Sequence, residues 1–176
     1  ILMLSNSVFS SSITIIKKEL HLSNRQFGTF GSFLGIGNIL GSLLYTLLSG
    51  KISRKFLFLL SMLICSINNL FFFITNYYYI LLLVRLITGI AQAVGFCYLP
   101  TWVEQFAIQK LKSWMITIMH LAENFGLIWG YLLNLIFTSN KWRYSLLCET
   151  VSLIIFFFIL LFIPKISFNK ELFFFS

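Results

Sequence analysis

The sequence contains no aspartate and very little charge of either sign. Only 10% of its 176 residues are charged, whereas a soluble domain carries roughly 25%. Apolar residues make up 59% and aromatic residues 18%. This composition excludes a surface that faces water on all sides and indicates an integral membrane protein. We therefore expect the net charge of +8 to lie at the membrane edges, against anionic lipid head groups, and not against nucleic acid.

Groups that would build a metal or catalytic site are also scarce. The three cysteines, Cys65, Cys97 and Cys148, fall far apart inside apolar runs and are interpreted as small buried apolar side chains. Neither a His-rich cluster nor a Ser, His and Asp set at one depth is present. A channel would need a pore loop with converging carbonyls or a charged ring, and the sequence shows neither. We expect no enzyme, no metal and no cofactor.

The long uncharged runs between clusters of charge are the expected membrane spans. A helix needs about 20 apolar residues to cross about 30 Å of hydrocarbon. Residues 1–16 are apolar but few, and they begin without methionine or a basic leader, so we expect the end of a first span and not a signal peptide. The sequence predicts an all-α six-helix bundle over 1–164, with spans at about 1–16, 27–49, 56–75, 78–100, 114–138 and 144–164, and the start of a cytoplasmic linker at 165–176.

Glycines with a spacing of four residues predict where helices pack closely. Helices in lipid associate through small residues that let two backbones approach. The expected packing glycines are Gly31, Gly35, Gly37 and Gly41 in the second span, Gly89 in the fourth, and Gly126 and Gly130 in the fifth.

The loop after the second expected span carries the first resemblance to a known family. Its basic residues Lys51, Arg54 and Lys55 are similar to those of the major facilitator superfamily loop signature, which helps to lock the cytoplasmic ends of helices during alternating access. Gly50 stands where the family has aspartate. The resemblance implies a gating loop with a weakened charge relay.

The later spans resemble the same family and, within it, the spinster-like transporters. The run from Arg85 to Ala93 is similar to the family pattern R-x-x-x-G-x-G, and Leu99 to Phe106 to the spinster-like P-T-x-x-x-D/E-x-F element. A Gly-spaced fifth span ending in Gly130-Tyr131 and a Trp142-Arg143 pair continue the match. The resemblance implies the amino-terminal half of a transporter, built from two three-helix repeats, that moves lipid-like solutes. Gln92 replaces a frequent acidic residue, which argues against proton coupling at that position.

Ionisable and polar residues inside the spans are the candidate site. Counting 1.5 Å per residue puts Arg85 and Glu149 at one depth, and predicts an ion pair between them. On the fifth span, His120, Glu123 and Asn124 form a polar stripe with a spacing of i, i+3 and i+4. Together with Gln92, which lies near the same midplane depth, they form a second expected cluster. Two interpretations stay open for this cluster: a substrate or proton site in the cavity, or a structural hydrogen-bond network.

The leading functional hypothesis is a secondary transporter for a small organic or amphipathic lipid-like solute. Its expected partners are the bilayer, the solute, and either a missing carboxy-terminal half or a second copy of the chain. The plasma membrane and a lysosomal or vacuolar membrane both remain open. The alternative is a degenerate half-transporter or a receptor-like scaffold that transports nothing.

Overall fold

Helices make up almost all of the computed structural model, which describes residues 4–11, 15–17, 23–136 and 142–162. The helices are α1 (Leu4–Ser11), α3 (Asn24–Leu48), α4 (Arg54–Ile74), α5 (Tyr78–Phe106), α6 (Lys112–Ile136) and α7 (Trp142–Phe162). Between the long helices the described links are short turns. The all-α class is therefore confirmed for the described part. The expected linker at 165–176 and the ends of the first, fifth and sixth spans lie outside the described residues.

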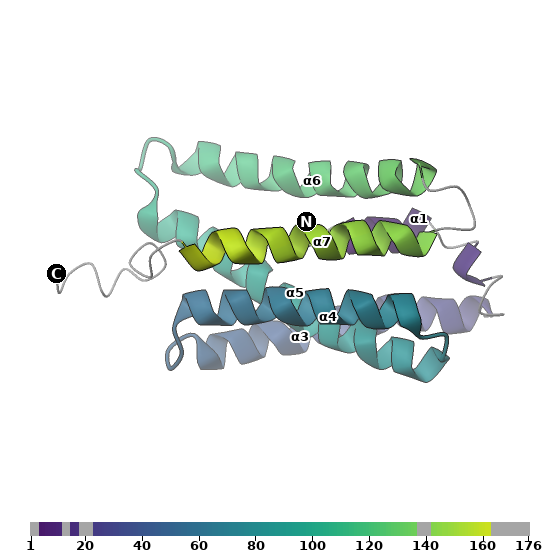
Figure 1. Cartoon of the computed structure of the whole chain (residues 1–176). Coiled ribbons are helices and arrows are strands. Elements are labelled where there is room, and N and C mark those ends of the chain that lie inside the picture. The colour runs from purple at the N-terminus through teal and green to yellow at the C-terminus, as the bar shows by residue number, and fades with distance from the viewer. Residues whose placement is uncertain (1–3, 12–14, 18–22, 137–141, 163–176) are drawn as a thin grey trace.

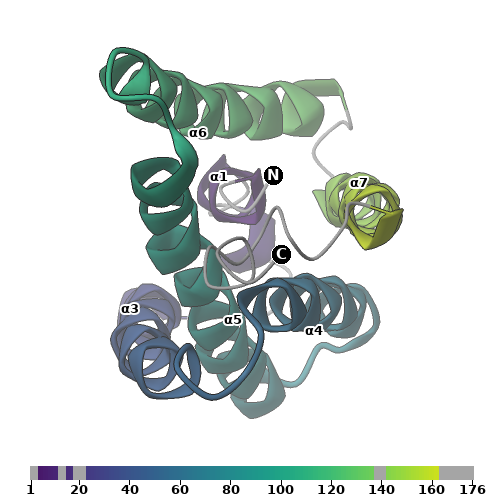
Figure 2. The same ribbon diagram turned by 90° about the vertical axis from the view of Figure 1, so that its left-hand side faces the viewer.

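The long helices lie side by side, and α5 crosses the others obliquely (Figure 1). Seen along their axes, α1 occupies the middle, with α4, α5, α6 and α7 around it (Figure 2). The most extensive helix contacts are α3 with α5, α4 with α7, α4 with α5, and α1 with α6. Since α5 packs on both α3 and α4, its side chains reach two interfaces as well as the space next to α1.

Four described helices are long and apolar enough to cross a membrane. They are Asn24–Leu48, Arg54–Ile74, Tyr78–Phe106 and, within α7, Arg143–Phe162. The fifth expected span, α6, is not among them, because His120, Glu123 and Asn124 lower the hydropathy of its central part. Four of the six expected spans thus meet the length and composition of a membrane helix, and a total of six stays a prediction.

Local sequence explains where α3 begins, and α5 is longer than its expected span. Ser23 and Gln26 form a capping box at the start of α3, in which each side chain bonds the backbone N–H of the other residue. The expected span over 78–100 ends at Pro100, whereas α5 continues through this proline to Phe106. Proline removes one backbone donor, and the adjacent Thr101 hydroxyl bonds the Cys97 carbonyl at 2.8 Å.

Two of the expected glycine pairs in α3 have opposite outcomes. A Cβ added to Gly37 would lie 2.3 Å from the Leu86 carbonyl oxygen, and one added to Gly41 would lie 2.4 Å from that of Ile90. Gly89 makes the reciprocal approach, 2.4 Å from the Leu34 carbonyl oxygen. These three glycines therefore allow the close backbone contact between α3 and α5.

The close packing expected at Gly31 and Gly35 is not seen among the described residues, and it stays a prediction. A Cβ added to either residue would meet no atom of the described residues within 4 Å, so neither takes part in a tight contact between the described helices. In α6, Gly130 is buried and Gly126 is half-buried. The role expected for that pair stays a prediction.

Candidate functional site

Several polar or charged side chains are almost completely buried within the bundle, and three of them are candidate site residues. Arg85 and Gln92 of α5 have exposed fractions of 5% and 1%, and Glu149 of α7 has 2%. A charge at the centre of a membrane helix costs at least about 2.5 kcal/mol on insertion scales. Such residues persist in a membrane helix where the surrounding protein compensates them.

Arg85 lies on aromatic rings and close to a carboxylate. Its guanidinium carbon lies 3.7 Å from the centre of the Phe9 ring of α1 and 5.0 Å from that of Phe72 of α4, so two cation–π contacts stabilise it. Glu149 acts on it electrostatically. Arg85 Nε is buried without a hydrogen-bond partner among the residues that the structure describes.

Arg85 and Glu149 are both buried and interact electrostatically, but the ion pair expected between them stays a prediction. The salt bridges of the described residues join Lys112 with Glu104 and His120 with Glu123, and a direct Arg85–Glu149 contact is not one of them. Counting residues along two helices gives a common depth, but the lateral distance depends on how α5 and α7 pack against α4.

Gln92 is connected to α1. The amide nitrogen of Asn6 donates to its Oε1 at 3.4 Å. A second interhelical bond lies nearby in sequence, where Asn68 of α4 donates to the Thr88 hydroxyl of α5 at 3.2 Å. The roles of Asn6 and Thr88 were not expected. The signal that could have found Asn6 is an amide inside an apolar run next to the helix that carries Arg85.

The polar stripe of α6 bonds within its own helix. His120 Nδ1 lies 3.2 Å from Glu123 Oε2, and Asn124 Nδ2 donates to the His120 carbonyl at 3.0 Å. The His120 side chain is 62% exposed. Gln92 and the α6 stripe therefore have different described partners, and their union in one midplane cluster stays a prediction.

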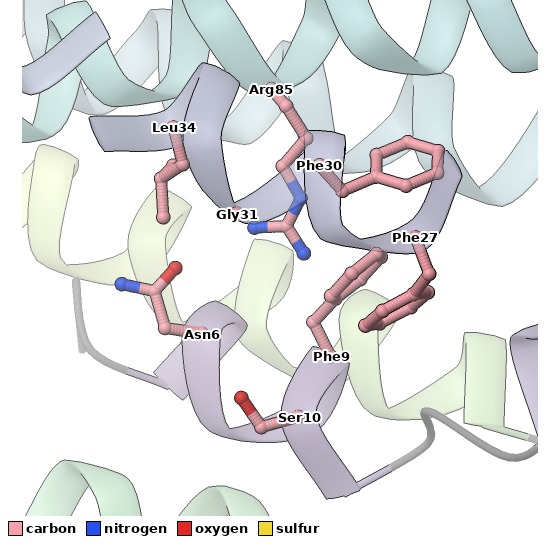
Figure 3. A pocket seen from close by; sticks show the side chains of 8 residues that line it. All are labelled: Asn6, Phe9, Ser10, Phe27, Phe30, Gly31, Leu34 and Arg85. Carbon is pink, nitrogen blue, oxygen red and sulfur yellow. The ribbon is translucent and has the colours of Figure 1, made fainter. Parts of the chain in front are cut away.

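A cavity of about 140 Å³ lies between α1, α3 and Arg85. Figure 3 shows the guanidinium of Arg85 reaching from α5 toward α1, with Phe9 and Asn6 opposite and Phe27 and Phe30 at one side. The lining residues are Asn6, Phe9, Ser10, Phe27, Phe30, Gly31, Leu34 and Arg85. The cavity thus joins an aromatic wall to one buried cation.

Basic residues at the loop between α3 and α4 connect the start of α4 with the ends of α5 and α7. Arg54 at the start of α4 donates to Gln105 Oε1 near the end of α5 at 2.6 Å. Lys55 Nζ donates at 3.0 Å to the Leu161 carbonyl in the last turn of α7, where a helix C-terminus favours a cation. Lys51 is exposed. Arg54 and Lys55 therefore fasten α4 to α5 and α7 at this end of the molecule.

Comparison with known proteins identifies the family. The model of the Major Facilitator Superfamily matches residues 1–172. The chain belongs to the Major Facilitator Superfamily. The match covers every helix described above, and the apolar helices agree with a multi-pass membrane protein.

Three similar proteins show which members of the superfamily this chain resembles. YwtG of Bacillus subtilis (strain 168), named provisionally as a metabolite transport protein, is 26% identical over 90% of this chain and 35% of its own length. Sugar transporter ERD6-like 8 of Arabidopsis thaliana is 29% identical over 85% of this chain and 31% of its own length. The D-xylose transporter of Levilactobacillus brevis is 26% identical over 79% and 31%. The chain thus spans about a third of the length of these relatives.

The comparisons support the broad expectation that the chain is the amino-terminal half of a transporter of this superfamily. The narrower resemblance to spinster-like transporters receives no support from these three relatives, whose names refer to metabolite or sugar transport. The motifs that suggested it, such as the element around Pro100 and Glu104, are short and lie at a helix end.

Proposed function

We propose that this chain forms the amino-terminal half of a secondary transporter that moves a small organic solute by alternating access. The observation that carries the proposal is the buried Arg85 with its electrostatic partner Glu149, next to a cavity inside a bundle of membrane helices. Ionisable residues inside membrane segments mark substrate or ion pathways because a purely structural bundle avoids their cost.

The packing of the helices supports an internal repeat of three helices. If α1, α3 and α4 correspond in order to α5, α6 and α7, the contact of α3 with α5 corresponds to that of α6 with α1. The contact of α4 with α5 then corresponds to that of α7 with α1, and the α4–α7 contact corresponds to itself. This pattern is what two repeats related by a pseudo-two-fold axis produce. We therefore propose six membrane helices in two repeats.

Under this proposal, the basic loop is the cytoplasmic fastening of the half. Arg54 and Lys55 bind neutral acceptors, a glutamine amide and a backbone carbonyl, so this fastening does not need the aspartate that Gly50 replaces.

The cargo is proposed to be small and partly apolar. The relatives named for sugar transport favour a small solute over a lipid, whereas the aromatic lining of the cavity favours a solute with an apolar part. A lysophospholipid-like cargo, the expectation from the spinster-like motifs, is tested as one member of the panel below.

The test is uptake into proteoliposomes by the full-length polypeptide that carries this chain. The vesicles are loaded with one unlabelled solute from a panel of D-xylose, a lysophospholipid and a small aromatic acid. Counterflow is measured as uptake of the same labelled solute from outside. We expect saturable counterflow for at least one solute, lost in Arg85→Gln protein that still elutes as a folded monodisperse species. Solute binding without counterflow for every member would instead support the alternative of a non-transporting scaffold or degenerate half.

A further inference from the structure

We propose that the cavity next to Arg85 binds a small monocarboxylate with a compact apolar body, of the kind represented by benzoate. This inference rests on the proposed function, since it names the cargo class of the same site. It goes beyond the three relatives, whose names refer to sugars or to metabolites in general.

The apolar part of the ligand is defined by the aromatic wall. Phe9 and Phe27 stack with ring centres 5.3 Å apart, and Phe30 lies 5.6 Å from Phe9 at a tilt of 56°. The cavity volume of about 140 Å³ is close to that of an engineered apolar cavity of about 150 Å³ that binds benzene. The cavity therefore has room for one ring.

The polar part of the ligand is defined by Arg85. Arg85 lines the cavity although only 5% of the residue is exposed, and Figure 3 shows its guanidinium reaching toward α1. A guanidinium presents its donors in a planar fork that matches a carboxylate. A ligand carboxylate in the cavity would therefore face a buried cation whose shape suits it.

The position of Glu149 leaves room for a ligand carboxylate as a second acid next to Arg85. Glu149 belongs to α7 and is not a lining residue of the cavity, which is formed by α1, α3 and Arg85. It acts on Arg85 electrostatically without lining the cavity. A sugar fits this lining less well, because its several hydroxyl groups need partners, and the polar lining residues besides Arg85 are Asn6 and Ser10.

The experiment measures benzoate binding to the purified chain in neutral phosphatidylcholine nanodiscs by isothermal titration calorimetry. Gly31→Leu is the blocking variant, because Gly31 lines the cavity and has open space at its Cβ position. Gly35→Leu is the matched control, since it lies one turn away on the same helix, also has open space, and does not line the cavity. Both changes add the same helix propensity, about 1 kcal/mol or slightly less.

We expect Gly31→Leu to weaken benzoate binding by roughly tenfold or more, and Gly35→Leu to leave it within about twofold of the original chain. Benzyl alcohol, which keeps the ring and loses the charge, should bind roughly tenfold more weakly than benzoate. Benzoate binding that is equal in the two variants, or equal affinity for benzyl alcohol, overturns the proposal.

The outcome is separable from that of the transport test. If benzoate binds as expected and the full-length polypeptide gives no counterflow, the transport function fails and the carboxylate site stands. If D-xylose shows counterflow while benzoate neither binds nor competes, the transport function stands and the carboxylate site is overturned.

Discussion

Two groups of polar residues at membrane depth have different environments in this protein. Arg85 of α5 is 5% exposed and contacts α1 and α4, with Glu149 of α7 acting on it electrostatically. The side chain of His120 on α6 is 62% exposed, and its described bonds stay within α6. The first group is fixed by four helices, whereas the second is satisfied locally. Perturbing the first should therefore affect the whole bundle, and perturbing the second should not.

The largest expected loss of stability follows from replacing Arg85, and it distinguishes Arg85 from the α6 stripe. Arg85→Met leaves the buried Glu149 carboxylate without a nearby cation and should lower the free energy of unfolding, by less than the roughly 3–5 kcal/mol that breaking a directly bonded buried pair costs. The measurement is the SDS-denaturation midpoint of the purified chain in mixed micelles. Since such a variant can fail to fold, the double variant Arg85→Met/Glu149→Leu serves as the second test and should recover part of the loss. A double variant as unstable as the single one would show that the two charges are not coupled.

The next effect sharpens the comparison within α3, between the glycines that meet α5 and those that do not. Gly37→Leu places side-chain atoms against the Leu86 carbonyl, where a Cβ would already lie at 2.3 Å. We expect a loss of about 1–3 kcal/mol from overpacking. Gly35→Leu is the control and should be neutral or slightly stabilising, because its Cβ has open space. Equal destabilisation by the two substitutions would contradict the observed face of contact.

The same glycines show how much could be predicted from the sequence. The spacing of four residues correctly indicated Gly37 and Gly41, but it indicated Gly31 and Gly35 equally. Residues 31 and 37 are six positions apart, which corresponds to faces about 120° apart on a helix. A single packing partner can meet only one of these faces. The choice is made by the crossing of α3 and α5, which a spacing rule does not contain.

Depth along the membrane was more predictable than lateral position. A constant rise per residue placed Arg85 and Glu149 at one height, and the structure brings them into electrostatic interaction. The same reasoning placed Gln92 near His120 and Glu123, but Gln92 bonds Asn6 of α1. Figure 2 shows α1 in the middle of the bundle, alongside α6. That helix is represented in the sequence by a short apolar run, so the partner was not expected there.

A smaller effect tests the interhelical amide bond next to Arg85. Asn68→Leu removes the bond to the Thr88 hydroxyl, which still donates to the Val84 carbonyl at 2.7 Å. Interhelical hydrogen bonds in membranes contribute about 0.6 kcal/mol on average, and we expect a loss of that size in the SDS titration. Thr88→Val should give a similar loss, and the double variant should not exceed either single one by much. Additive losses would indicate that the two side chains act independently.

The smallest expected effect concerns the α6 stripe, and it decides whether that stripe has a function. His120→Ala and Glu123→Gln remove one pair with i,i+3 spacing and should change stability by about 0.2–0.5 kcal/mol. Because the pair is exposed and locally bonded, stability alone does not separate a structural role from a functional one. Counterflow by the full-length polypeptide does. A clear loss of counterflow with unchanged stability would assign the stripe to the solute or proton pathway, since a local helix contact cannot produce it. Unchanged counterflow in both variants would confine the working residues to Arg85 and its neighbours on α1, α3 and α7.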